Sequence, residues 1–189
     1  MLLALLADEE GIVVQGLREF DLESGQMVEI LKGGTYKLRR YPRAQVLEMA
    51  AQEANRTGWD RIETPHLFVA LTTLEYGCTR RALWQQNAYP DIVTELMRAA
   101  LAQMVGSGEP GTAVTSSEAS IGPRAREVLE LAEKEAQQRG RPEASDFEII
   151  QSILMRGSSQ TAKLLQSMGV DPAQVMAYAE TLNQPRQEP

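Results

Sequence analysis

Apolar residues recur along much of the chain at intervals of three and four residues, the spacing of one face of an α-helix. The first clear stripe covers residues 43–57 and ends at Gly58, a residue typical of helix ends. Thr64 and Pro65 mark the start of a second helix, because threonine caps helices and proline suits their first turn. The same pattern predicts helices over residues 79–86, 90–104, 124–139, 146–155, 159–167 and 172–182. The sequence contains no convincing strand-like alternation, so the predicted fold class is all-α.

The predicted helices recur in the same order after a constant shift of 82 residues. Matched positions include Leu47 with Leu129, Gly58 with Gly140, and Pro90 with Pro172. Because helix ends and helix starts repeat together with core positions, the sequence predicts two tandem four-helix units related by a pseudo-twofold axis. The first unit covers residues 41–104 and the second covers residues 122–183. Residues 105–121, rich in Gly, Ser and Thr, form the predicted linker, and residues 184–189 form a tail.

A partial third copy precedes the two full units. A shift of 66 residues lays Ala4 on Ala70 and Leu17 on Leu83. Residues 1–40 therefore correspond to the back half of a unit, with two to three helices, and the matching front half is missing. Such a half unit leaves an apolar face uncovered. We expect that face to close either against the full pair or across a homodimer, and the sequence leaves both arrangements open.

Charge and composition narrow the functional classes. The 189 residues include 19 Lys and Arg against 26 Asp and Glu, a formal net charge of −7. This balance argues against nucleic acid and anionic membranes as partners. The apolar start, residues 1–6, is too short to span a bilayer and lacks the basic residues of a signal peptide. A single cysteine suits a reducing compartment, so we expect a cytoplasmic protein.

Few residues offer catalytic or metal-binding chemistry. The chain has one histidine, His66, and one cysteine, Cys78, without metal-ligand spacing, and it lacks a phosphate-binding glycine loop. Cys78 stands at a predicted helix start, where the helix dipole could activate a thiol, but a packed small residue is the favoured interpretation. A capped-turn or surface role is favoured for His66. We expect no enzyme activity, no cofactor and no metal.

Four segments resemble the Clp N-terminal repeat, the helical N domain of Clp-type AAA+ unfoldases. They are residues 128–136 (VLELAEKEA), 64–71 (TPHLFVAL), 1–11 and 164–171. The family pattern is L-E-x-A-x-x-E-A, then T-E-H-L-L-L-A-L-L, then a leucine and a Gly-Val-Asp turn. The resemblance covers residues 41–183 as a full pair and residues 1–31 as a half copy.

The resemblance implies a non-catalytic protein–protein interaction module. Clp N domains bind adaptors and client proteins. We expect a protein without the ATPase modules, like stand-alone accessory proteins of Clp chaperone and proteolysis systems. The expected partners are a Clp-type ATPase or peptidase, or client proteins. One alternative is a truncated or degenerate paralogue repurposed as a general helical binding module. A lower alternative is a small helical enzyme using Cys78 or His66.

The resemblance also bears on phosphoarginine, which some family members bind through the glutamate of T-E-H and a hydroxyl at the start of the first helix. The glutamate positions here hold Pro65 and Phe147, and the hydroxyl positions hold Arg40 and Gly122. Because the carboxylate that would clamp a guanidinium is missing, we expect phosphoarginine not to bind.

Five residues are candidates for direct contact with a protein partner. They are Trp59, His66, Arg80, Arg81 and Trp84. Tryptophan is enriched at interaction hot spots, and the two arginines could form a local basic patch for an acidic partner. Core packing of the tryptophans and a solvated helix face for the arginines are the favoured interpretations. His66 is the only family histidine retained, since the second copy has Glu148 in its place.

Overall fold

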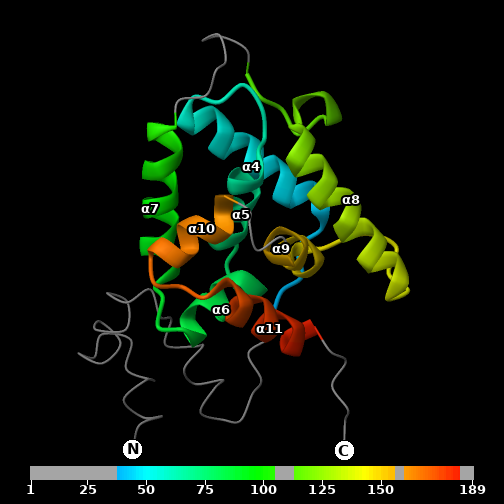
Figure 1. The fold of residues 1–189 in the computed structure, drawn as a ribbon. Coiled ribbons are helices and arrows are strands. Elements are labelled where there is room, and N and C mark those ends of the chain that lie inside the picture. Colours follow the sequence, from blue (N-terminus) through cyan, green and yellow to red (C-terminus); the bar gives the residue numbers. More distant parts are fainter. Residues whose placement is uncertain (1–37, 105–112, 156–159, 184–189) are drawn as a thin grey trace, which may run out of the picture. The chain divides into compact units, whose positions relative to one another are not determined.

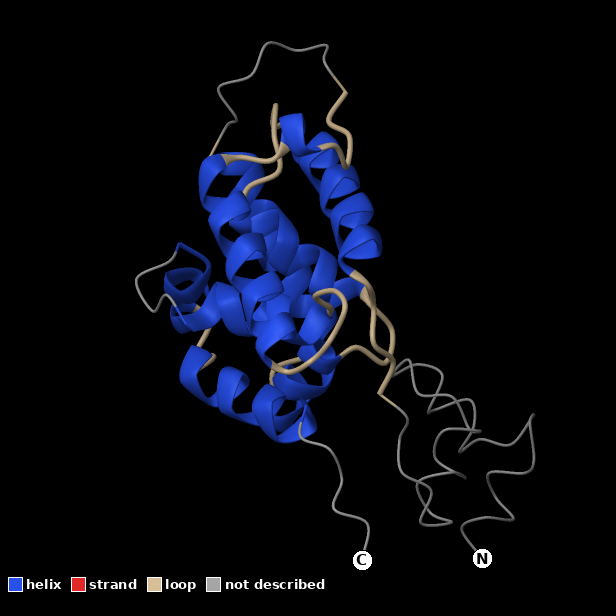
Figure 2. Cartoon of the chain, turned by 90° about the vertical axis from the view of Figure 1, so that its right-hand side faces the viewer, coloured by secondary structure: helices blue, strands red, loops and turns tan. Residues whose placement is uncertain are grey.

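The computed structural model describes residues 38–104, 113–155 and 160–183 (Figure 1). The helices of the first repeat are α4 (Arg43–Thr57), α5 (Thr64–Thr73), α6 (Cys78–Gln85) and α7 (Pro90–Gln103). Those of the second are α8 (Pro123–Gln138), α9 (Asp146–Met155), α10 (Gln160–Ser167) and α11 (Pro172–Asn183), preceded by the short 3₁₀ turn η1 (Glu118–Ser120). No strand occurs in these ranges, so the predicted all-α class is confirmed (Figure 2). The predicted half repeat, except its last three residues, and the predicted tail lie outside the described residues, as does much of the linker.

Glycine ends the first helix of each repeat region in the same way. Gly58 and Gly140 adopt left-handed conformations, with φ of 78° and 69°. The following residue then donates its N–H to a carbonyl five positions back, from Trp59 to Ala54 at 2.9 Å and from Arg141 to Ala136 at 2.9 Å. This is the Schellman arrangement, which satisfies carbonyl groups left free at a helix end.

The core is built around α5 and α9, which are buried on nearly all sides. In α5, residues 65–72 are buried, and in α9, residues 146–154 are buried. Helices α4, α6 and α7 pack against α5, whereas α8, α10 and α11 pack against α9, and the two central helices also contact each other. Helices that are buried on nearly all sides are largely apolar, as both segments are. Helix α9 also buries Asp146, Glu148, Gln151 and Ser152.

The backbone just before each repeat pairs with the other repeat. The N–H of Arg43 donates to the carbonyl of Ala144 at 3.1 Å, and the N–H of Asp146 donates to the carbonyl of Tyr41 at 2.9 Å. In the reciprocal pair, the N–H of Ile62 donates to the carbonyl of Ser120 at 2.8 Å, and the N–H of Gly122 donates to the carbonyl of Ile62 at 2.9 Å. Each repeat therefore completes the loop between the first two helices of the other.

Candidate partner-binding surface

The structure places His66 inside the fold, as the residue that caps α5. Its Nδ1 accepts the backbone N–H of Glu63 at 2.9 Å, and its Nε2 lies 3.2 Å from the hydroxyl of Thr57. The ring of Trp59 meets the imidazole edge-on at 5.2 Å, and His66 is fully buried. Burial lowers its pKa from 6.5 to about 4, so the imidazole is neutral at physiological pH. A partner cannot reach this ring, so His66 does not qualify as a residue in direct contact with a partner.

Glu148 occupies the equivalent position in α9 and is also fully buried. One carboxylate oxygen accepts the N–H and the hydroxyl of Ser145 at 3.0 and 2.6 Å. The other pairs with Arg141 and accepts the side-chain amide of Asn183 at 3.3 Å. Burial alone would raise the pKa of Glu148, but the bonds from Ser145 and the nearby Arg141 lower it overall. This arrangement could have been predicted from the sequence, since Ser145 and Glu148 have the spacing of a capping box.

Cys78 is fully buried at the start of α6. Its backbone N–H donates to Oδ2 of Asp146 at 3.3 Å, so its contacts tie α6 to the first turn of α9. Burial raises the pKa of the thiol well above its ordinary value, and the neighbouring carboxylate of Asp146 acts in the same direction. The thiol is therefore protonated and shielded, which matches the packed small residue favoured by the sequence.

The positions aligned with the phosphoarginine site hold an arginine of the chain itself. The guanidinium of Arg40 lies 4.3 Å from the centre of the Phe147 ring, and its Nη2 donates to Asn183 at 2.6 Å. Arg141 donates to the same amide oxygen at 2.8 Å. Burial and the charge of Arg141 lower the pKa of Arg40. A cation already stands where the resemblance would place a bound guanidinium.

The other aligned position brings in Glu63, a residue that the sequence analysis did not single out. A Cβ added to Gly122 would lie 2.2 Å from Oε1 of Glu63, so the carboxylate rests against the glycine backbone. Burial raises the pKa of Glu63. This contact is hard to predict from the sequence, because Glu63 stands two residues before the family's glutamate position, held here by Pro65.

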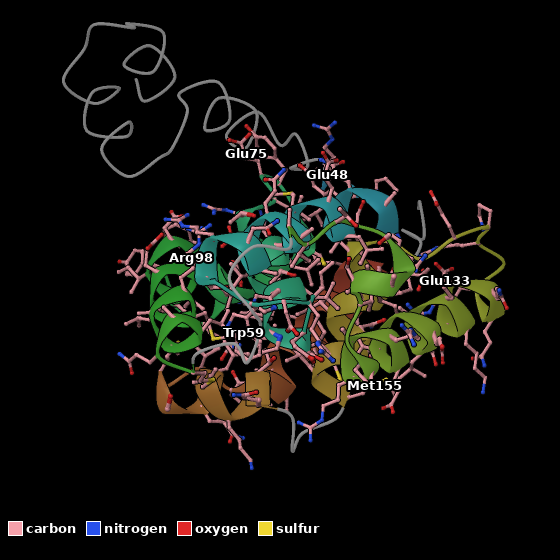
Figure 3. All side chains as sticks on the ribbon, turned by 90° about the horizontal axis from the view of Figure 1, so that it is seen from above. Glu48, Trp59, Glu75, Arg98, Glu133 and Met155 are labelled. Carbon is pink, nitrogen blue, oxygen red and sulfur yellow. The ribbon has the colours of Figure 1, made fainter. Side chains whose placement is uncertain are left out.

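Trp59 and Arg80 are both engaged within the first repeat. Nε1 of Trp59 donates to the carbonyl of Leu101 at 3.2 Å, beside α7 (Figure 3). Arg80 pairs with Asp91 at 2.8 Å and donates to the carbonyl of Thr72 at 3.0 Å, leaving 17% of its side chain exposed. Its charge is thus largely neutralised by Asp91, which weakens the idea of a basic patch. Arg81 beside it is half-buried.

Trp84 is different, because it belongs to a group of exposed apolar side chains. The large hydrophobic residues exposed on α6, α7 and their flanks are Trp84, Tyr89, Ile92, Leu96 and Met104, which we call the α7 apolar surface. Trp84 is 40% exposed and meets Tyr89 edge-on at 5.0 Å. Among the described residues, the one other large exposed apolar side chain is Met155, at the end of α9. Large exposed apolar groups that gather in one place mark interaction sites.

The described ranges contain neither a candidate metal site nor a candidate membrane span. No three His, Cys, Asp or Glu side chains gather there closely enough to hold a metal ion. None of the helices described is both long and apolar enough to cross a membrane.

Known relatives and solved structures agree with the helical architecture. The chain is 27% identical over 131 residues to the chloroplastic chaperone protein ClpC of Pisum sativum, covering 69% of this chain and 13% of that protein. It is 26% identical over 133 residues to the Porphyra purpurea ClpA homologue, an ATP-dependent Clp protease ATP-binding subunit, covering 70% and 15%. The chain therefore spans a small fraction of the length of these relatives.

Two solved N-terminal domains share the fold. The Hsp104 N-terminal domain of Candida albicans superposes with a TM-score of 0.61 at 13% identity, covering 78% of this chain and 94% of that one. The ClpD N-terminal domain of Arabidopsis thaliana gives 0.56 at 16% identity, covering 79% and 97%. The family model described as the Clp repeat (R) N-terminal domain matches residues 42–168, well over half of the chain. The chain accordingly belongs to the Clp N-terminal repeat family.

Proposed function

We propose that the protein is a non-catalytic interaction module that serves a Clp-type unfoldase or protease as an accessory or adaptor protein. The observation that carries this proposal is the α7 apolar surface, which is exposed on a fold otherwise closed around α5 and α9. Its partners would be the Clp ATPase, its peptidase, or client proteins passed to them. Energy consumption would rest with the partner, and the module would act by docking.

The burial of Cys78 and His66 supports the non-catalytic part of the proposal. Cys78 and His66 are both fully buried, and each makes a hydrogen bond at the start of a helix. A nucleophilic thiol needs a lowered pKa and access to substrate, whereas burial raises the pKa of Cys78. The small-enzyme alternative therefore lacks support at the two residues on which it rested.

Charge and composition support the remaining parts of the proposal. The net charge of −7 favours protein partners over nucleic acid and anionic membranes. A single cysteine suits a reducing compartment, and a cytoplasmic location is part of the proposal on that ground. The full-repeat boundaries, 41–104 and 122–183, are part of the proposal, as is the half repeat at residues 1–40. A homodimer through that half repeat stays a prediction, and sedimentation of the full chain tests it.

Affinity capture tests the Clp assignment. The tagged full chain is incubated in its native lysate with and without Mg-ATP, beside an unrelated acidic helical protein with the same tag. We expect enrichment of Clp unfoldase or peptidase subunits, with nucleotide dependence reporting which state of the ring is bound. Recovery of unrelated proteins alone would contradict the assignment and favour a repurposed helical binding module.

Phosphoarginine provides a second test. We expect calorimetry with free phosphoarginine to show no binding to the full chain, because Arg40 already covers the face of Phe147 with a positive charge. The variant Arg40→Ala serves as a comparison, since it removes that charge. Micromolar binding to the unaltered protein would overturn this expectation.

A further inference from the structure

An apolar ridge follows one side of α7 and ends at the residue after it, and three of its four residues are exposed. Ile92, Leu96, Ala100 and Met104 follow one another at intervals of four residues, so they line one side of the helix. Ile92 is 58% exposed, Leu96 is 48% and Met104 is 38%. The pair formed by Trp84 and Tyr89 extends the ridge at the start of α7. This ridge is separate from the buried stripe by which α7 packs on α5.

A row of carboxylates runs beside the ridge. Asp91 and Glu95 each precede a ridge residue by one position, and their side chains are 65% and 64% exposed. Arg80 pairs with Asp91, and Arg98 lies between Glu95 and Glu53 at 2.6 and 2.5 Å. Since Arg98 faces two carboxylates, one negative charge is left unbalanced here. The exposed one of the two is Glu95.

The fold itself does not require this face, because the second repeat lacks it. At a shift of 82 residues, Asp91 corresponds to Ala173, Ile92 to Gln174, Glu95 to Ala177, and Leu96 to Tyr178. The acidic row is replaced by alanines, and the ridge is replaced by a polar residue and a half-buried tyrosine. The two repeats build the same helix at this place, but only the first carries an amphipathic outer face.

The packing of the two repeats differs at the same place. Helix α6 packs along α11, where Gln86 and Asp171 exchange hydrogen bonds at 3.2 and 3.0 Å. Among the described residues, the corresponding pair, α7 and α10, does not pack in this way. One hydrogen bond joins the first residue of α10 to the end of α7, from Nε2 of Gln160 to Sδ of Met104 at 2.7 Å. Helix α7 runs along the outer edge of the helical body in two views at right angles (Figures 1 and 3). Within the described residues, no helix packs over Ile92 and Leu96, which are 58% and 48% exposed.

We propose that this face of α7 binds an amphipathic α-helix of a partner protein, with basic residues beside that helix's apolar side. The partner's apolar residues would lie on Ile92 and Leu96, and its lysines or arginines would meet Asp91 and Glu95. A helix laid on an apolar strip is a common mode of recognition, and complementary charges fix its register. The inference rests on the proposed interaction function and names the surface and the chemistry of the partner.

A second copy of the chain fits this face less well. Two α7 helices packed against each other would bring exposed carboxylates together without a matching cation. The one basic residue in α7 is Arg98, which is already engaged by Glu53 and Glu95. Charge complementarity thus favours a basic partner helix over self-association.

Site-specific photo-cross-linking tests the proposal in the full chain. A benzophenone amino acid replaces Ile92, and the matched control carries it at Gln174, the same position in the second repeat. After illumination in the native lysate, the cross-linked peptides are identified by mass spectrometry. The identified segment is then synthesised and titrated against the full chain, followed by Trp84 fluorescence at low and high salt.

We expect a cross-link from position 92, but not from 174, to a helical segment with apolar residues three or four apart and basic residues beside them. Asp91→Lys with Glu95→Lys should weaken binding of the synthetic helix by roughly tenfold or more and abolish its salt dependence. The double variant Ala173→Lys with Ala177→Lys should leave binding unchanged. Circular dichroism of each variant checks that the fold is intact.

Three results would overturn the proposal. The first is a cross-link to a second copy of the chain, and the second is a cross-linking yield no higher than that of the control position. The third is a partner segment that binds the charge-reversed variant as tightly as the unaltered protein. None of these depends on whether Clp subunits are captured. If capture succeeds while the cross-link fails, the Clp assignment stands and this surface is wrong. If a basic helix from an unrelated protein is cross-linked and capture recovers no Clp subunit, the surface stands and the Clp assignment is contradicted.

Discussion

His66 and Glu148 occupy equivalent positions in the two repeats, and each caps the start of its helix with a different chemical group. Each is the third residue of a central helix, and each accepts a backbone N–H from the residue three positions earlier, Glu63 or Ser145. Free N–H groups at a helix start need such acceptors. The neutral imidazole does so without a charge, whereas the carboxylate needs Arg141 as a counter-ion. This difference leads to two separate predictions.

The first prediction concerns acid sensitivity. In the folded chain the pKa of His66 is about 4, against 6.5 when the ring is free. The unfolded chain therefore takes up a proton more readily, and His66 contributes stability that is present above pH 6.5 and lost as the pH falls towards 4. The limit of this contribution is about 3 kcal/mol.

His66→Gln separates this titration from the capping contact. Glutamine can accept the same N–H but carries no titrating group in this range. We expect the variant to be about 1–2 kcal/mol less stable at neutral pH, through lost packing on Trp59, and to lose less stability on acidification. Urea unfolding at a series of pH values measures both effects. Parallel pH profiles for the two proteins would contradict the role assigned to His66.

The second prediction concerns Glu148. Removing its carboxylate in Glu148→Ala would leave the guanidinium of Arg141 and the polar groups of Ser145 without their buried acceptor. We expect a loss of about 3 kcal/mol in the free energy of unfolding. Glu130→Ala, at an exposed position of α8, is the control and should change stability by less than about 0.5 kcal/mol. Equal effects of the two variants in urea unfolding would count against a buried network.

At the scale of helices, the third prediction tests the shared end signal. Gly58 and Gly140 have positive φ, and a Cβ at either site would meet no atom within 4 Å. Any cost of Gly58→Ala or Gly140→Ala therefore comes from backbone conformation, and we expect about 1 kcal/mol for each. Gly58→Asn should cost less, because asparagine tolerates the left-handed region. Thermal unfolding checks this order, and an alanine variant as stable as the unaltered protein would be inconsistent with it.

Helix boundaries could be predicted from sequence because their signals are local. Gly58 ends α4 and Pro90 begins α7 as expected, and the predicted helix at 79–86 lies one residue from the observed Cys78–Gln85. The exposed face of α7 could not be predicted in this way. Apolar residues occur on both sides of that helix, and periodicity does not tell which side a neighbour covers. Of the α7 apolar surface, Trp84 alone was a candidate contact residue from sequence.

Contacts between segments that are separate in the chain could not be predicted from the sequence either. His66 is buried against Thr57, at the end of α4, and Trp59, in the loop that follows α4. The contact of Arg40 with Phe147 joins residues far apart in the chain. The repeat made a common fold for both halves predictable, but the side chains that fill matching places differ. Those differences decide which surface is free for a partner.

At the scale of the whole described body, the repeats exchange the segments that complete them. The backbone at Tyr41 pairs with the second repeat, and the backbone at Gly122 pairs with the first. Asp146 strengthens the exchange, since its carboxylate accepts the N–H groups of both Tyr41 and Cys78 at 2.9 and 3.3 Å. Together with the contact between α5 and α9, these bonds make each repeat part of the other's fold. We therefore expect the two repeats to unfold as one cooperative unit.

The fourth prediction follows from this exchange. A protease site inserted within residues 105–112 allows the full chain to be cut between the repeats after folding. We expect the two pieces to stay bound and to elute together in gel filtration, because the contacts that join them do not depend on the peptide connection. The melting temperature should become dependent on protein concentration, since unfolding now separates two chains. The uncut protein, and the cut protein after denaturation in urea, are the controls. Separate elution without denaturant would show that each repeat folds alone, and the cross-repeat bonds would then be minor contacts between independent domains.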